Sequence, residues 1–183
     1  MCGITGFVSR SVPDQGALKA MADKIRHRGP DDEGFFVDEH CAIAHRRLSI
    51  IDLANGHQPM VSQDGKLVLA YNGEVYNFQQ LREELIAAGR TFLTNSDTEV
   101  ILQGYQQFGP EFTKRLRGMF AFVIWDKEKQ ELYGARDPFG IKPFYYYHDG
   151  KTFLFGSEIK SFLSHPGFHK ELDEEKVPEY LAY

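Results

Sequence analysis

The sequence is poor in cysteine and has no long apolar segment. Its 183 residues include only two cysteines, Cys2 and Cys41, too few for a disulfide framework or a structural zinc set. The longest unbroken apolar run, residues 119–125, is far shorter than the ~18 residues that a membrane-spanning helix needs, and no signal sequence is recognisable. We therefore expect a chain without a membrane partner, in the reducing cytoplasm, with at least one free thiol.

Blocks of positive charge and nucleotide-binding loops are also missing. The 26 acidic residues outnumber the 21 basic ones, for a net charge of −5, which argues against a nucleic-acid partner. Neither G-x-x-x-x-G-K-S/T nor G-x-G-x-x-G occurs. His165 and His169 are separated by Pro166 and Gly167, so they cannot share a helix face as zinc ligands would. A small molecule is the expected ligand, and no metal site is predicted.

The apolar residues that are present follow alternating short elements of a single domain. Their spacing predicts strands over 2–9, 33–38, 40–47, 67–71, 119–126, 131–136, 143–148 and 152–156, and helices over 15–26, 77–88, 96–108 and 157–163. Two groups of strands with helices between them indicate two packed sheets covered by helices. The expected class is a layered α+β domain.

Cys2 directly follows the initiator Met1 and precedes Gly3. Removal of Met1 would place a thiol and a free α-amine on one residue, and the amine, with a pKa of about 7.7 to 8.0, can accept the thiol proton. Gly3 would let the backbone lie close to a substrate. A lone cysteine is, however, more often a small buried hydrophobe than a nucleophile. The residues alone leave both interpretations open.

Asn72-Gly73 follows the strand predicted over 67–71 and is first of all typical of a type I′ hairpin turn. The second arm of such a hairpin would be very short. An alternative is therefore an exposed turn whose Asn72 amide and Gly73 N–H serve as oxyanion-hole donors.

Two further positions could bind the head of an amino acid. Asp97 lies at a helix start with the capping-box pattern Ser96-Asp97-Thr98-Glu99, where an acid ordinarily complements the helix dipole but can also hold an ammonium group. Arg46-Arg47 interrupts an apolar run. A guanidinium there can receive a carboxylate in bidentate fashion, although a surface ion pair is the commoner outcome.

Several motifs are more informative together than singly. They are MCGI at 1–4, RGPD at 28–31, RLSIID at 47–52, NGEVYN at 72–77, SDTE at 96–99, ARDPFG at 135–140 and GSEIK at 156–160. With these motifs the sequence, from residue 1 to about 163, closely resembles the N-terminal glutaminase domain of glutamine-dependent asparagine synthetases. Those domains are class II glutamine amidotransferases of the N-terminal-nucleophile (Ntn) hydrolase superfamily.

The resemblance implies a fold and a set of residue roles. The fold would be a four-layer αββα sandwich of two mainly antiparallel sheets flanked by helices. Cys2 would be the nucleophile and its α-amine the base, while Asn72 and Gly73 stabilise the oxyanion. Arg47 would bind the α-carboxylate of glutamine and Asp97 its α-ammonium. The implied pocket wall consists of Leu48, Ser49, Ile50, Ile51 and Glu74.

The activity implied by the resemblance is hydrolysis of the L-glutamine side-chain amide, through a Cys2 thioester, to L-glutamate and ammonia. Residues 1–164 would form this domain, which needs no cofactor. The acidic segment 165–183 would lead toward a synthetase domain that uses ATP and Mg²⁺ to amidate aspartate, in a homodimeric full-length protein. Two alternatives stay open: an amidotransferase with another ammonia acceptor, and a silent glutamine-binding module that retains Met1.

Overall fold

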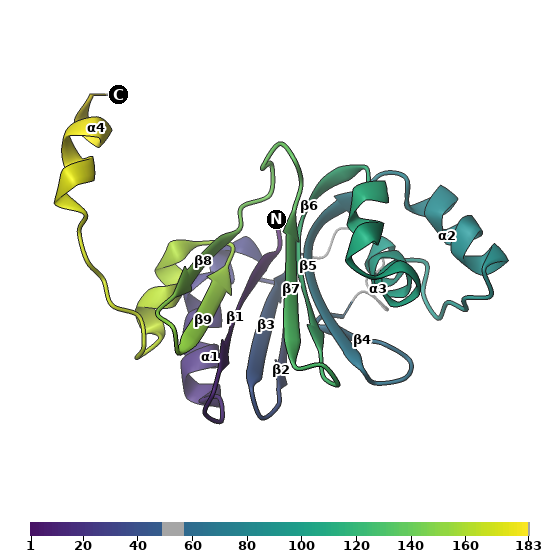
Figure 1. The fold of residues 1–183 in the computed structure, drawn as a ribbon, viewed down its shortest axis with the longest axis horizontal. Coiled ribbons are helices and arrows are strands. Elements are labelled where there is room, and N and C mark those ends of the chain that lie inside the picture. The colour runs from purple at the N-terminus through teal and green to yellow at the C-terminus, as the bar shows by residue number, and fades with distance from the viewer. Residues whose placement is uncertain (49–56, 183) are drawn as a thin grey trace.

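Two antiparallel sheets pack face to face in the computed structural model, which describes residues 1–48 and 57–182 (Figure 1). The first sheet has the strand order β2-β3-β1-β9-β8 and the second the order β4-β5-β6-β7. The strands are β1 (Gly3–Ser9), β2 (Asp32–Val37), β3 (Cys41–Arg47), β4 (Met60–Val61), β5 (Leu67–Val75), β6 (Gly118–Asp126), β7 (Glu131–Arg136), β8 (Tyr145–His148) and β9 (Thr152–Gly156). The prediction of an α+β class with two antiparallel sheets is confirmed.

Helices cover the outer face of each sheet. Helix α1 (Gln15–Lys24) lies on the first sheet, and α2 (Phe78–Ala87) and α3 (Asp97–Phe108) lie on the second. Short 3₁₀ turns connect the elements at Arg26–Arg28, Gly109–Arg115, Ile159–Ser164 and Glu174–Lys176. The last helix, α4 (Val177–Leu181), lies apart from both sheets in Figure 1. Within the described residues, no helix combines the length and apolar character needed to cross a membrane.

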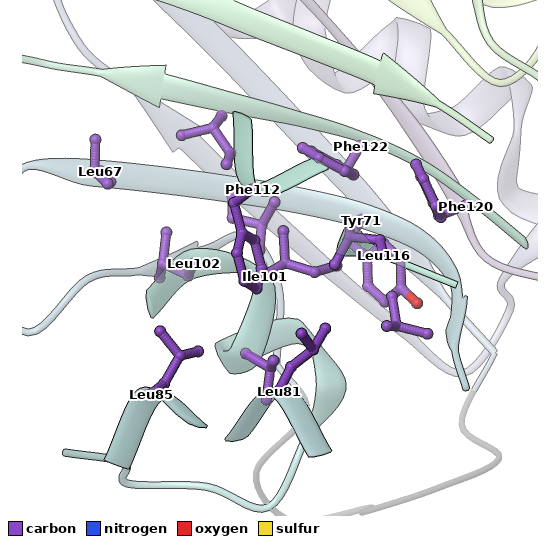
Figure 2. Close-up of a cluster of buried hydrophobic side chains, with 14 residues drawn as sticks. Leu67, Tyr71, Leu81, Leu85, Ile101, Leu102, Phe112, Leu116, Phe120 and Phe122 are labelled. Atoms are coloured by element: carbon purple, nitrogen blue, oxygen red, sulfur yellow. The ribbon is translucent and has the colours of Figure 1, made fainter. Parts of the chain in front are cut away.

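Side chains of β5 alternate between two hydrophobic clusters, as the pleat of a strand dictates. Leu67, Leu69 and Tyr71 face α2 and α3 and share a cluster with Leu81, Leu85 and Ile101. Figure 2 shows Leu67 and Tyr71 in this cluster. Val68 and Ala70 face the first sheet and pack in the space between the sheets. The second sheet therefore contributes to two cores, and residues of β5 near its C-terminal end can reach either side.

The helix predicted over 157–163 is a 3₁₀ turn, and β4 and α4 were not predicted. The other predicted bounds agree with the observed ones to within two residues everywhere except at the strand predicted over 67–71. That strand continues to Val75, with Asn72 opposite Ala121 and Gly73 opposite Phe120 on β6. The prediction of a hairpin turn at Asn72-Gly73 is therefore wrong. The alternative of an exposed turn is wrong as well, because Asn72 is buried. The long pairing with β6 outweighs the local turn preference. Gly73 is needed instead for space, since a Cβ there would lie 2.3 Å from the Met119 carbonyl oxygen.

His45 joins the two sheets through a single hydrogen bond. It projects from β3 between the sheets, and its Nε2 lies 3.0 Å from the Tyr71 carbonyl oxygen on β5. Burial lowers the pKa of His45 from the usual 6.5 to about 4, against the opposing effect of this bond. The ring is therefore neutral near pH 7, and because a carbonyl only accepts, Nε2 carries the hydrogen.

We predict that His45 makes the protein less stable in mild acid. Between pH 6.5 and 4 the unfolded chain binds a proton at His45 that the folded chain does not. The free energy of unfolding should therefore fall by about 3 kcal/mol as the pH drops through this window. Urea unfolding of wild type and His45→Gln from pH 7 to pH 4 measures the effect. The variant should show the shallower pH dependence, and exposed His148→Gln should match wild type; equal slopes for wild type and His45→Gln would contradict the prediction.

Candidate active site

The chain start is held firmly because β1 lies in the middle of the first sheet, between β3 and β9. Ile4 donates its N–H to Ser157 Oγ (3.0 Å), and its carbonyl accepts from the Ser157 N–H (2.8 Å). The Nε of Arg28 donates to the Cys2 carbonyl at 3.0 Å, while its Nη1 pairs with Glu158 at 3.1 Å. These contacts fix the backbone of Cys2 at a point where chain ends ordinarily fray.

The Cys2 side chain is directed toward the space between the sheets. Ile4, two residues further along β1, packs in the cluster between the sheets, and strand geometry places Cys2 on the same face. Its Sγ lies 3.8 Å from the Leu48 carbonyl oxygen and is partly exposed. Met1 precedes it and is exposed, so the nitrogen of Cys2 is an amide as long as Met1 is present.

The two arginines of β3 have different environments, although both are buried. Arg46 faces α1, and Asp23 of α1 and Glu33 of β2 neutralise its charge. Arg47 has the opposite orientation, like His45, and its charge helps to lower the pKa of His45 after the larger effect of burial. Since Gly3 is opposite Arg46, Arg47 is the arginine beside Cys2. Arg46 forms ion pairs, as expected for this pair of residues, although its own side chain is buried.

Asn72 projects from β5 into the space between the sheets, on the same face as Val68 and Ala70. Its Nδ2 is buried and has no hydrogen-bond partner among the described residues. A buried amide donor without a partner costs stability, and such an exception points to a ligand that completes it. Glu74 follows on the same face of the strand but is exposed.

Asp97 is the first residue of α3, which Ser96 begins by accepting a hydrogen bond from the Glu99 N–H at 3.3 Å. The capping box is only half formed, because the Glu99 carboxylate accepts from the N–H of Thr94 at 2.6 Å instead of returning to Ser96. Asp97 Oδ2 accepts from the Tyr71 hydroxyl at 2.7 Å and from the Val75 N–H at 3.0 Å. The acid is thus tied to β5.

The predicted residues that the structure describes lie in the region where β1 and β5 approach each other, with Asp97 on the side of β5 that the helices cover. β1 contacts β5, and the charges of Asp97, Glu74 and Cys2 all add to the effect of burial in raising the pKa of Tyr71. Cys2, Arg47, Asn72, Gly73, Glu74, Leu48 and Asp97 therefore belong to one region. Ser49, Ile50 and Ile51, also predicted for the pocket wall, lie outside the described residues.

Residue-by-residue interpretation of the sequence missed two supporting side chains, Arg28 and Ser157. Both hold the backbone of the chain start. The only signal for them was their place in motifs of the resemblance, RGPD and the segment after residue 156. Across the described part of the chain, no three His, Cys, Asp or Glu side chains gather into a group that could hold a metal ion.

A cysteine at the second position of the chain, in one region with a buried amide donor, an arginine and an acid, is an arrangement suited to amide chemistry on an amino acid. The two-sheet architecture is Ntn-like. The chain belongs to the family of glutamine amidotransferase domains, whose model matches residues 1–183. More narrowly, it is a class II domain that is homologous along its whole length to the N-terminal domain of asparagine synthetases.

Relatives of this chain include the glutamine-hydrolyzing asparagine synthetases 1 and 2 of Bacillus subtilis strain 168. The chain is 45% identical to the first over its full length and 44% identical to the second over 91% of its length. It spans only 30% and 23% of those two proteins. Glutamine phosphoribosylpyrophosphate amidotransferase from B. subtilis has a similar fold, with a TM-score of 0.75, 25% identity, and coverage of 89% of this chain and 43% of that one.

We predict that the two thiols differ sharply in reactivity. Cys2 is partly exposed, whereas Cys41 is fully buried and its burial raises the pKa of its thiol, so thiolate forms at Cys41 only with difficulty. Iodoacetamide should add once to the native protein, at Cys2, and a second time only in urea. Intact mass and peptide mapping check the result. A native Cys2→Ala variant should gain no adduct, and modification of native Cys41 would contradict the assignment.

Proposed function

We propose that this chain is the glutaminase part of a glutamine-dependent asparagine synthetase. The observation that carries the proposal is the buried, unpartnered amide of Asn72, which projects from β5 into the space between the sheets, toward which Cys2 at the start of the central strand β1 is also directed. In this proposal the two sheets and their helices form the four-layer αββα sandwich of Ntn hydrolases. In the proposal residues 1–164 form the domain. Phe168, which lies beyond this boundary, also packs against the domain through Tyr147 and Phe162.

The proposed chemistry begins with removal of Met1, which converts the nitrogen of Cys2 into a free α-amine. The amine takes the thiol proton, and the thiolate attacks the side-chain amide carbon of glutamine. Asn72 Nδ2 and the Gly73 N–H stabilise the oxyanion. The C–N bond breaks as the Cys2 ammonium returns its proton to the leaving nitrogen, which departs as ammonia. Water, deprotonated by the same amine, then hydrolyses the thioester to glutamate and restores the thiol.

The proposed substrate clamp binds the two charged groups of the amino acid from different elements. Arg47 on β3 receives the α-carboxylate, and Asp97 on α3 receives the α-ammonium. Leu48, Ser49, Ile50, Ile51 and Glu74 line the remaining wall. Because both clamping groups are fixed, the distance from the amino-acid head to the Cys2 thiol selects a side chain of the length of glutamine.

We further propose that the ammonia serves ATP-dependent amidation of aspartate in a part of a longer homodimeric protein that these 183 residues do not include. The support is that this chain spans 30% of asparagine synthetase 1 at 45% identity. In the proposal ATP and Mg²⁺ act only in that other part. The alternative of another ammonia acceptor has the weaker support, because identity to the phosphoribosylpyrophosphate enzyme is 25%.

A Cys2→Ala variant tests the proposal. It should lose L-glutamine hydrolysis by at least about 1,000-fold, because the step that forms the thioester has no substitute. It should also gain no adduct from an electrophilic diazo-ketone analogue of glutamine, whereas wild type lacking Met1 gains one. Coupled assay of glutamate and intact mass measure both effects.

Cys41→Ala is the control, because this thiol is buried and distant from the chain start. It should keep both the hydrolysis and the single adduct. Hydrolysis that survives in Cys2→Ala would eliminate the thioester mechanism, and a processed wild type that neither reacts with the analogue nor hydrolyses glutamine would favour the silent binding module.

A further inference from the structure

Tyr71 lies midway along β5, and its backbone is held by side chains from two other segments of the chain. Strand β4 pairs with β5 only at Val68 and Leu69, so it does not reach Tyr71. The Tyr71 N–H donates instead to Gln58 Oε1 at 2.7 Å. Its carbonyl accepts from His45 Nε2 of the first sheet at 3.0 Å. Buried side chains therefore replace the missing neighbour strand and fix the backbone of this one residue.

The ring of Tyr71 is fixed as well. It is only 3% exposed and packs in the cluster beneath α2 and α3, where Figure 2 shows it beside Leu116 with its hydroxyl oxygen at the edge of the cluster. Burial, and after it the charge of Asp97, raises the pKa of the Tyr71 phenol. The hydroxyl keeps its proton and is the donor in its contact with Asp97.

The Tyr71 hydroxyl and a backbone N–H both donate to the same oxygen of the Asp97 carboxylate. Oδ2 accepts from Tyr71 Oη at 2.7 Å and from the Val75 N–H at 3.0 Å. Two donors on one oxygen set the plane of a carboxylate, because rotation about the Cβ–Cγ bond would break both bonds. The ammonium of a ligand is thereby directed to Oδ1.

We propose that Tyr71 is a positioning residue that orients the Asp97 carboxylate toward the α-ammonium of the substrate and so contributes to selection of α-amino acids. The inference rests on the proposed function, because it needs glutamine in this site. Tyr71 does not contact the reacting atoms. It acts through Asp97, and it links the helix that carries the ammonium-binding acid to the sheet that carries the oxyanion donors.

The Tyr71→Phe variant removes only the hydroxyl and keeps the ring in its cluster. We expect KM for L-glutamine to rise about tenfold with kcat within about twofold, because a hydrogen bond to a charged group is lost from substrate binding and not from the chemical step. The competitive inhibition constant of 4-carbamoylbutanoate, which is glutamine without its α-amine, should not change. General damage to the fold would weaken both ligands equally.

Two further variants make the experiment specific. Tyr105→Phe is the matched control, since this ring packs against the same cluster but from the far part of α3, and its kinetic constants should equal those of wild type. In an Asp97→Asn background, Tyr71→Phe should change kcat/KM for glutamine by less than about twofold, because residues that act as a unit are not additive.

The outcomes separate the two claims. If wild type lacking Met1 neither binds nor hydrolyses glutamine, the proposed function fails and the role of Tyr71 fails with it. If wild type turns glutamine over but Tyr71→Phe leaves its KM unchanged, or weakens glutamine and 4-carbamoylbutanoate by the same factor, the positioning role alone is overturned.

Discussion

The pairing of β1 along both of its edges is the constraint on which the site depends. A nucleophile on the second residue of a chain is useful only if the terminus is immobile, and free termini ordinarily fray. Here the neighbouring strands β3 and β9, the Ser157 bonds to Ile4 and the Arg28 bond to the Cys2 carbonyl remove that freedom. The thiol therefore lies beside the hydrophobic cluster between the sheets and is not part of that cluster.

The remaining parts of the site come from elements that are far apart in the chain and are brought together by packing between the sheets. Arg47 reaches the site from the first sheet, Asn72 from the second, and Asp97 from a helix that covers the second. The bond from His45 to the Tyr71 carbonyl and the bond from the Tyr71 hydroxyl to Asp97 connect all three layers. Small shifts between the layers would therefore alter the proposed substrate clamp before they altered the fold.

Local sequence patterns could predict the elements but only part of the site. The start of α3 was predictable because Ser96 caps its own helix, which placed Asp97 correctly. The prediction of a turn at Asn72-Gly73 was wrong because pairing with β6, almost fifty residues later in the chain, decides the conformation there. Arg28 acts on a backbone carbonyl 26 residues away, and no local pattern signals such a contact. The orientations of Arg46 and Arg47 on β3 could not be predicted, because the alternation of side chains along a strand does not say which face of the strand is turned toward the other sheet.

In the mechanism that we propose, the α-amine of Cys2, released by removal of Met1, is the base for its own thiol. Treatment of a Met1-bearing preparation with a methionine aminopeptidase yields a series of samples in which intact mass gives the processed fraction. If the α-amine is the base, the rate of glutamine hydrolysis rises in proportion to that fraction and extrapolates to zero for the unprocessed chain. Equal hydrolysis by protein that retains Met1 would contradict it.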